Sequence, residues 1–350
     1  MAPRITRWLP AVVAPVAVGA AVALPLTAAS AAVDLPDKTP QQVLELLAQG
    51  KDVEGFSGVV EQTSALGLPE LPTTGQGADD QAAEALALLT GSHTARVYAS
   101  GDDKVRVQVL DERSERDVVR NGNDVWLWDS RENAATHLTF EGEADTSGYT
   151  APTPSEAADR FLDAVDDDTT VSVSTDGTVA GRSAYRLVLT PDSADTTVGS
   201  VSIAVDAQTG LPLRVQVVPK GSADPAFAVG FTTLSIGQPD VSFDFVPPQG
   251  ATVEEETVTK PEGAPNGEGG EYDGPTPTVT GEGWDAVVEV PVGADGFGEA
   301  QSSPLFGQLT TPVDGGNALS TTLVNVLVTD DGRVLAGLVP TSRLQAVAAD

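Results

Sequence analysis

Few side chains in this sequence have the chemistry of a catalytic or metal site. The chain holds two histidines, His93 and His137, and no cysteine, so thiol catalysis and thiolate metal ligation are excluded. There is no Gly-x-Ser-x-Gly elbow and no glycine loop suited to phosphate. A Ser-His-Asp arrangement stays open, because such groups meet in space rather than in sequence. We expect a protein that is not an enzyme and that carries no cofactor.

An acidic run, Asp166 to Asp168, has the oxygen ligands that calcium prefers. Its spacing does not match that of known calcium loops. We interpret the run as solvated charge after the end of a helix, and we predict no metal site.

Two aromatic side chains are the most informative feature of the sequence. Of only four tryptophans in the chain, Trp126 and Trp128 stand two residues apart and therefore share one face of an expected strand. Val125 and Leu127 point to the opposite face. Such a strand is covered by core on both faces, or is covered on one face and borders an apolar cavity on the other. The sequence leaves both alternatives open.

The net charge limits the classes of partner. Fifty-one acidic and nineteen basic side chains give a formal charge of −32. Nucleic-acid phosphates would be repelled, so we expect no nucleic-acid partner. Anionic membranes are disfavoured for the same reason, so any lipid must be bound through an apolar surface. Solubility of an exported protein also explains the acidity.

Residues 1–31 read as a signal peptide. Arg4 and Arg7 precede an apolar run, and Ala29-Ser30-Ala31 is suited to cleavage before Ala32. An uncleaved membrane anchor is the alternative, although Pro10, Pro15 and Pro25 weaken a spanning helix. Without cysteine there is no lipid-anchoring residue. We expect an exported, extracytoplasmic protein.

Three one-sided helices are predicted. Thr39 to Gln42 and Thr153 to Glu156 each form a capping box at a helix start. Between them, Asp79 to Leu89 repeats the helical spacing of apolar residues. Each of the three helices needs a surface to cover.

Short apolar runs separated by turn residues predict a β-rich domain. The candidate strands are Gly55 to Thr63, His93 to Ser100, Lys104 to Leu110, Arg116 to Arg120, Asp124 to Asp129, Ala134 to Phe140, Thr170 to Ser174, Ser183 to Thr190, Val198 to Asp206, Leu213 to Pro219, Ala226 to Ile236 and Val241 to Phe245. A sheet of about eleven strands cannot stay flat. The predicted fold class is therefore α+β, a strongly curved antiparallel sheet with helices closing its concave side.

The strand residues favour a hollow sheet over a filled one. Val105, Val107 and Val109 share one face of their strand. Only 5% of the chain is aromatic, so few rings are present to fill the middle. Either the helices or a ligand must occupy that space.

The order of six motifs resembles a known superfamily. It is similar to the LolA-type lipoprotein carriers and to their relatives, the MucB/RseB amino-terminal domain and the LppX-like lipid carriers. The resemblance covers about residues 38–255. The motifs are the first capped helix, Gly55 to Gln62, the Trp126 strand, Gly181 to Leu189, Val205 to Pro212 and Phe243 to Gly250.

The resemblance implies an incomplete, strongly curved antiparallel β-barrel with a helical lid, in a carrier that holds acyl chains or the lipid of a lipoprotein in an apolar cavity. Candidate cavity residues are Phe56, Val60, Leu86, Leu89, Val105, Val107, Val109, Trp126, Trp128, Phe161 and Leu162. In these carriers an arginine ties the lid shut. Arg96 and Arg106 lie on candidate strands, but neither matches a family motif, so the role stays unassigned.

A long connection, from Leu66 to Pro72 and through the helix to Leu89, is the candidate lid or mouth. The alternative is a surface excursion without a function.

The composition changes after Val253. We predict a half-barrel domain at 32–253, an acidic Gly/Pro-rich linker at 254–279 and a small β-hairpin unit at 280–350. In the small unit, Gly283 to Pro291 reads as a strand, and Leu319 to Thr329 and Arg333 to Val339 read as a hairpin. This unit loosely resembles the carboxy-terminal portion of RseB-type proteins. The alternative function is therefore an envelope stress sensor in an anti-sigma-factor pathway, whose C-terminal unit binds a protein partner.

Overall fold

The structure is a computed structural model that describes residues 35–50, 53–68, 92–101, 103–110, 114–141, 153–163, 165, 168–175, 177–259, 277–291 and 304–349. The predicted signal peptide, the predicted helix Asp79 to Leu89 and most of the predicted linker lie outside these residues. Among the described helices, none is long and apolar enough to span a membrane.

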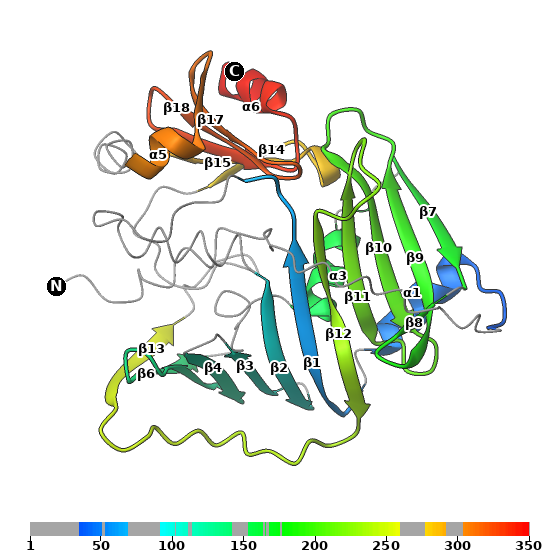
Figure 1. Cartoon of the computed structure of the whole chain (residues 1–350), viewed down its shortest axis with the longest axis vertical. Coiled ribbons are helices and arrows are strands. Elements are labelled where there is room, and N and C mark those ends of the chain that lie inside the picture. Colours follow the sequence, from blue (N-terminus) through cyan, green and yellow to red (C-terminus); the bar gives the residue numbers. More distant parts are fainter. Residues whose placement is uncertain are drawn as a thin grey trace.

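A large curved sheet dominates the described part of the chain (Figure 1). Its thirteen strands are β1 (Gly55–Ser64), β2 (His93–Ser100), β3 (Lys104–Leu110), β4 (Glu115–Asn121), β5 (Asp124–Asp129), β6 (Ala134–Glu141), β7 (Thr169–Ser174), β8 (Thr178–Val179), β9 (Arg182–Pro191), β10 (Val198–Asp206), β11 (Pro212–Pro219), β12 (Phe227–Ile236) and β13 (Thr252–Thr259).

The strand order is β13-β6-β5-β4-β3-β2-β1-β12-β11-β10-β9-β7, with β8 beside β9, so the sheet is not closed. The prediction of a wholly antiparallel sheet is wrong at one place, because β13 pairs with β6 in parallel. Residues 254–259 also belong to β13 rather than to the predicted linker. Their glutamates are typical of a linker. An edge strand tolerates such charged residues because it pairs with a neighbour on one side only and is open to solvent on the other.

Two helices lie on one face of the sheet, which we call the inner face. α1 (Pro40–Gly50) packs mainly on β7, β9 and β10, and α3 (Pro154–Asp163) packs on β11 and β12. Figure 1 shows both helices behind these strands. One buried hydrophobic cluster joins Val43 of α1 and Phe161 of α3 to inner-face residues of the sheet, among them Ile203 and Val215.

Both helix starts have the predicted capping boxes. The Thr39 hydroxyl accepts a hydrogen bond from the Gln42 backbone N–H at 3.3 Å, and the Gln42 side chain accepts one from the Thr39 N–H at 2.9 Å. At α3, Glu156 N–H donates to Thr153 Oγ1 at 3.3 Å and Thr153 N–H donates to Glu156 Oε2 at 2.7 Å. These bonds satisfy N–H groups that have no partner inside the helix.

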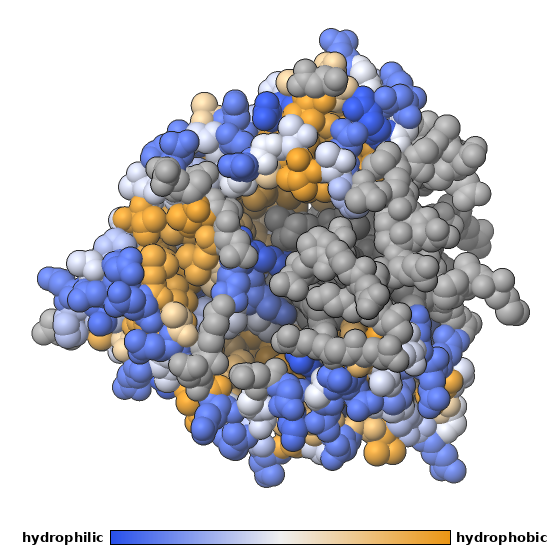
Figure 2. All heavy atoms as spheres, turned by 180° about the vertical axis from the view of Figure 1, so that it is seen from behind, coloured by the Kyte–Doolittle hydropathy of each residue, from blue (hydrophilic) through white to orange (hydrophobic). Residues whose placement is uncertain are grey.

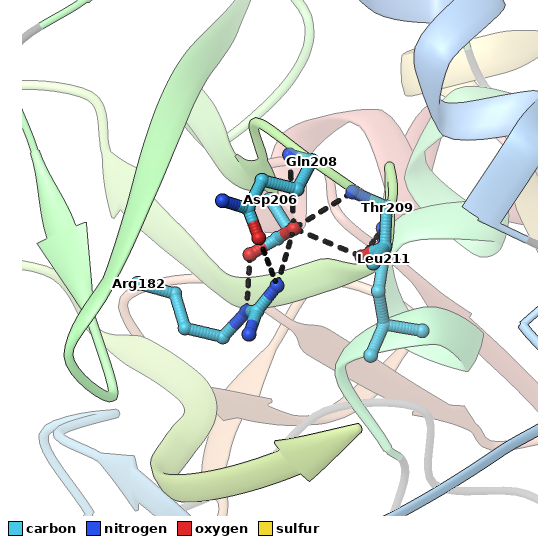
Figure 3. A network of polar contacts seen from close by, with 5 residues as sticks. All are labelled: Arg182, Asp206, Gln208, Thr209 and Leu211. Atoms are coloured by element: carbon cyan, nitrogen blue, oxygen red, sulfur yellow. Dashed lines mark hydrogen bonds and ion pairs between the residues drawn. The ribbon is translucent and has the colours of Figure 1, made fainter. Parts of the chain in front are cut away.

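A polar network fixes the turn on which α1 rests (Figure 3). Asp206 Oδ1 accepts hydrogen bonds from Arg182 Nη2 at 3.0 Å and from the backbone N–H groups of Gln208 and Thr209 at 3.0 and 2.8 Å. Burial raises the pKa of Asp206, but these hydrogen bonds outweigh burial and leave the pKa below its usual value. At the end of this turn, Gly210 has φ +79°, and a Cβ there would lie 1.8 Å from the Leu46 carbonyl oxygen of α1. Only glycine fits that contact.

The segment between β12 and β13 crosses to the far edge of the sheet and runs along the bottom of Figure 1. The prediction of a strand at Val241 to Phe245 is wrong, because this segment pairs with no strand. It is held by side chains at strand ends: Asn121 Nδ2 donates to Asp244 Oδ1, and Asn133 Nδ2 donates to the Gly250 carbonyl, both at 2.8 Å. The alternating apolar residues serve side-chain contacts with the sheet.

Residues 277–291 and 304–349 build a second sheet, at the top left of Figure 1. Its order within the described residues is β14-β15-β19-β18-β17-β16. The elements are β14 (Thr278–Thr280), the 3₁₀ helix η3 (Gly283–Asp285), β15 (Val287–Pro291), α5 (Pro304–Leu309), β16 (Thr311–Val313), β17 (Gly316–Ser320), β18 (Asn325–Thr329), β19 (Arg333–Gly337) and α6 (Thr341–Ala349).

Two sequence-based boundaries in this unit are wrong. Gly283 to Asp285 form a helical turn rather than the start of a strand. The expected strand Leu319 to Thr329 is two strands separated by residues 321–324. In that turn the Thr321 hydroxyl accepts the Val324 N–H at 3.0 Å, a local bond that competes with strand pairing.

The second sheet is joined to the first through buried side chains. Trp284 is 2% exposed, stacks on Phe161 of α3 with ring centroids 6.2 Å apart, and donates a hydrogen bond to Thr169 Oγ1 at 2.8 Å. Leu323, fully buried, belongs to the same hydrophobic cluster as α1 and α3. The two sheets therefore share a core at their junction.

Candidate functional site

The inner face of β2 to β5 is the candidate functional surface. Neighbouring strands place small apolar side chains in register there: Val97 of β2 lies opposite Val107 of β3, which lies opposite Val118 of β4, which lies opposite Leu127 of β5. We call this surface the valine face. Its members are Ala95, Val97, Ala99, Val105, Val107, Val109, Val118, Val125 and Leu127.

The valine face holds one leucine and otherwise valine and alanine, whereas the rest of the inner face mixes valines such as Val201 and Val215 with larger side chains. Leu187 of β9, Ile203 of β10 and Leu213 of β11 are fully buried in the half of the sheet on which α1 and α3 pack. Valine and alanine fill less of the space in front of β2 to β5. Val97 and Val107 are nevertheless only 2% and 4% exposed, so a ligand reaches them only when the inner face opens.

Most described cavity candidates lie on the inner face. Val105, Val107 and Val109 are on the valine face, and Val60 and Phe56 of β1 continue it toward β12. The Phe56 ring meets the Phe231 ring edge-on at 5.8 Å. Phe161 and Leu162 of α3 pack in the same hydrophobic cluster as Val60 and Val107. Leu86 and Leu89 lie outside the described residues.

Trp126 and Trp128 lie on the other face, which we call the outer face. Trp126 stacks on His137, its cross-strand neighbour, with centroids 4.2 Å apart. Phe245 of the crossing segment contacts both tryptophans, at 5.6 and 6.2 Å. With Val125 fully buried on the inner face, β5 is a strand covered on both faces. The structure does not bring the tryptophans together with the valines.

Sequence reasoning missed several members of the valine face. Ala95, Val97 and Ala99 alternate along β2 with more exposed residues, and this period-2 pattern was the available signal. For Val125 and Leu127, the sequence showed only that they lie on the strand face opposite to the two tryptophans, and not that this face is the inner one. A strand with two apolar faces gives no sign of which face looks inward.

The two candidate lid arginines lie on the outer face. Arg96 is exposed. Arg106 donates from Nε to Asp117 Oδ2 at 3.0 Å, and the Asp117 side chain is 1% exposed. Burial raises the pKa of Asp117, and the Arg106 guanidinium offsets only part of that effect. This pair joins β3 to β4 on the outer face.

The two histidines do not form a shared catalytic centre. His137 Nε2 lies 3.0 Å from Asp124 Oδ1 on the outer face, whereas His93 pairs in register with Gln62 and shares the inner face with Val60 and Ala95. Among the described residues, no group of three or more histidine, aspartate or glutamate side chains could hold a metal ion.

Figure 2, which shows the molecule from behind, agrees with the acidic composition. Hydrophilic side chains cover most of the coloured surface. Hydrophobic side chains gather in two areas, one on the second sheet at the top and one at the left, on the side of the molecule that holds α1 and β7.

Comparisons with known proteins give matches among solved structures alone. No family model and no curated protein matches the chain. Among solved structures, the chain is similar to MucB in the Pseudomonas aeruginosa MucA/MucB complex, with 17% identity, 88% of this chain and 96% of that chain covered, and a TM-score of 0.42.

Two further solved structures match. A LolA superfamily protein of Nitrosomonas europaea has 11% identity over 59% of this chain and 96% of its own, with a TM-score of 0.25. An uncharacterized conserved protein of Thermus thermophilus has 12% identity over 61% of this chain and 98% of its own, with a TM-score of 0.35. The structural matches thus include the LolA and MucB groups that the motif order resembles. Since these TM-scores are below 0.5, function is inferred from this chain's own residues.

Proposed function

We propose that this protein binds acyl chains on the valine face and carries them outside the cytoplasm, as an exported lipid or lipoprotein carrier. The observation that supports this function is the run of mostly small apolar side chains across β2 to β5. Those on β2 and β3 adjoin the half of the sheet in which large side chains and two helices complete the core, and those on β4 and β5 form a second buried cluster with Leu138. A surface of this kind holds methylenes without directional bonds. Each buried methylene contributes about 0.8 kcal/mol.

Binding requires a change in the covering of the valine face. Because Val97 and Val107 are almost inaccessible to solvent, an acyl chain must displace whatever lies over them. α3 is the described element best placed to respond, since it packs on β11 and β12 beside the valine face and contributes Phe161 to the shared cluster. Loading and release are therefore conformational steps rather than chemical ones.

The direct test is native mass spectrometry of the full chain purified without detergent. We expect adducts with the masses of lipids, and saturable binding of cis-parinaric acid by the delipidated protein. A protein that carries no lipid and binds no probe would refute the proposal.

The second candidate is a sensor whose C-terminal sheet holds a protein partner. The contact between Trp284 and Phe161 favours it, because one side chain links the second sheet to α3. MucB, one of the similar structures, is seen in complex with MucA. In a sensor, a ligand bound on the valine face would change the surface that the second sheet offers to the protein partner.

Hydrogen exchange on the full chain separates the two functions. Loading with cis-parinaric acid should change exchange in β2 to β5 in either case. A sensor also predicts altered exchange in β17 to β19. A carrier predicts that exchange in these three strands is the same with and without the probe.

A further inference from the structure

Three polar side chains, those of Gln62 and Ser64 on β1 and of His93 on β2, interrupt the apolar inner face at one end of these strands. Ser64 is 5% exposed, and its Oγ has no hydrogen-bond partner among the described residues. The Nε2 atom of His93 is also buried without such a partner. Buried polar atoms are normally satisfied, and an unsatisfied one costs free energy. Two of them close together therefore need a reason.

The register places these two side chains on the same face. Gln62 lies opposite His93 across the β1–β2 pair, and Ser64 is two residues further along β1. Diagonal neighbours of this kind are separated by about 7–8 Å between Cα atoms. Both point to the side that holds Val60 and Ala95. Gln62, itself 5% exposed, extends the polar area between them.

The polar area lies where the two sheets meet. Two residues beyond Ser64, the Leu66 carbonyl accepts a hydrogen bond from Thr322 N–H at 3.0 Å, and the next residue, Leu323, is fully buried in the shared core. The second sheet therefore closes this end of the inner face. The valine face continues from Ala95 toward β5 in the other direction.

We infer that Ser64 and His93 bind the polar head group of the ligand whose acyl chains lie on the valine face. This inference rests on the proposed function and adds an orientation and a class of ligand. A hydroxyl and a neutral imidazole each donate or accept a hydrogen bond. They match an uncharged oxygen-bearing head group, such as an ester or a glycerol hydroxyl. A charged head group would need a buried counter-charge.

The stability of the empty protein gives a first test. Ser64→Ala removes a buried polar atom that has no partner among the described residues, so we expect it to leave the melting temperature of the delipidated chain unchanged or to raise it. A clear fall would show that the hydroxyl has a structural partner, and would overturn the inference. Thr63→Ala, on the exposed opposite face of β1, is the matched control.

The decisive test compares two probes of equal chain length by displacement of cis-parinaric acid. Ser64→Ala and His93→Leu should each weaken binding of monooleoylglycerol by about fivefold, and should leave binding of 1-octadecene unchanged. His93→Gln places an amide near the position of Nε2 and should restore most of the affinity.

The outcomes distinguish the inference from the function on which it rests. If the wild-type chain binds neither probe, the proposed carrier function fails. If it binds both probes and the variants weaken both equally or neither, the acyl site stands and the head-group assignment is overturned. Thr63→Ala should match the wild type for both probes.

Discussion

The two halves of the large sheet use the same inner face in different ways. From β7 to β12, large side chains such as Leu187 and Leu213 pack with α1 and α3 and with Trp284 of the second sheet. From β2 to β5, the same face carries mainly alanine and valine, with Leu127 on β5 and with Arg116 and Arg120 on either side of Val118 on β4. The bulky Trp126 and Trp128 lie on the outer face, where both contact Phe245. One half is covered by α1 and α3, and the other presents mostly smaller side chains that are equally buried.

Under the proposed function, this difference places stability and acyl binding in separate parts of one sheet. Core strands gain free energy from close packing of large side chains. A binding surface instead needs volume that a ligand, rather than the protein's own side chains, can occupy. Variants in the two halves should therefore have opposite effects: loss of stability in one half and loss of binding in the other.

The largest effect is expected at the junction that completes the core half. Trp284→Ala removes the stack on Phe161 and the hydrogen bond to Thr169, and should lower the free energy of unfolding by about 3–5 kcal/mol. Urea denaturation measures this loss. Val279→Ala, at a 61% exposed position of the same sheet, should have almost no effect. A loss of less than about 1 kcal/mol for Trp284→Ala would mean that the two sheets do not share a core.

A pair of truncations compares the halves directly. Leu187→Ala on β9 should cost about 2–5 kcal/mol and leave acyl binding intact. Val107→Ala on β3 should cost about 1.5 kcal/mol or less, because it removes only two methyl groups, and should weaken binding of cis-parinaric acid. If both substitutions lowered the free energy of unfolding equally and left equal affinity for cis-parinaric acid, the distinction between the two halves would be wrong.

The two buried Arg–Asp pairs predict opposite pH dependences. The pKa of Asp206 is lowered in the folded state, so its stabilising contribution is present above the unfolded pKa of about 3.9 and is lost as the pH falls through the folded pKa. The pKa of Asp117 is raised, so its burial cost is present at neutral pH and is relieved as the pH falls.

Urea unfolding between pH 3 and pH 7 tests these signs. In the wild type, the Asp206 carboxylate causes part of the fall in the free energy of unfolding at acidic pH. That part should be absent in Asp206→Asn. In the wild type, protonation of Asp117 at mildly acidic pH relieves the cost of burying its carboxylate. This contribution to the free energy of unfolding should be absent in Asp117→Asn. The same change of slope in both variants would contradict the assigned directions.

The smallest effect concerns the helix caps. Thr39→Ala removes the hydroxyl that accepts the Gln42 N–H and should cost about 1 kcal/mol. Because α1 packs on the core half, acyl binding should be unchanged. Thermal unfolding measures the cost, with Thr63→Ala as the control on an exposed strand position. Loss of binding in Thr39→Ala would mean that α1 takes part in loading.

Local patterns in the sequence predicted much of this fold. The expected strands Lys104 to Leu110 and Asp124 to Asp129 are β3 and β5, and both described capping boxes are formed. Period-2 alternation and caps are properties of neighbouring residues, so they can be recognised without the fold.

Features that depend on distant contacts could not be predicted. Nothing near Val125 shows which face of its strand lies inward, because that depends on where the crossing segment places Phe245. The glutamates of β13 read as a linker until the strand is seen beside β6. Ser64 and His93 attract notice only after the register shows them on one apolar face.

The claim that the valine face holds the acyl chain is tested most directly by filling it. Val107→Trp places a large ring among Val97, Val109 and Val118, whereas Arg96→Trp places one on the exposed outer face of β2. Native mass spectrometry of the two full-length variants measures lipid occupancy. We predict that Val107→Trp loses its lipid adducts and that Arg96→Trp keeps them. Folded Val107→Trp protein with the lipid occupancy of the wild type would contradict the claim.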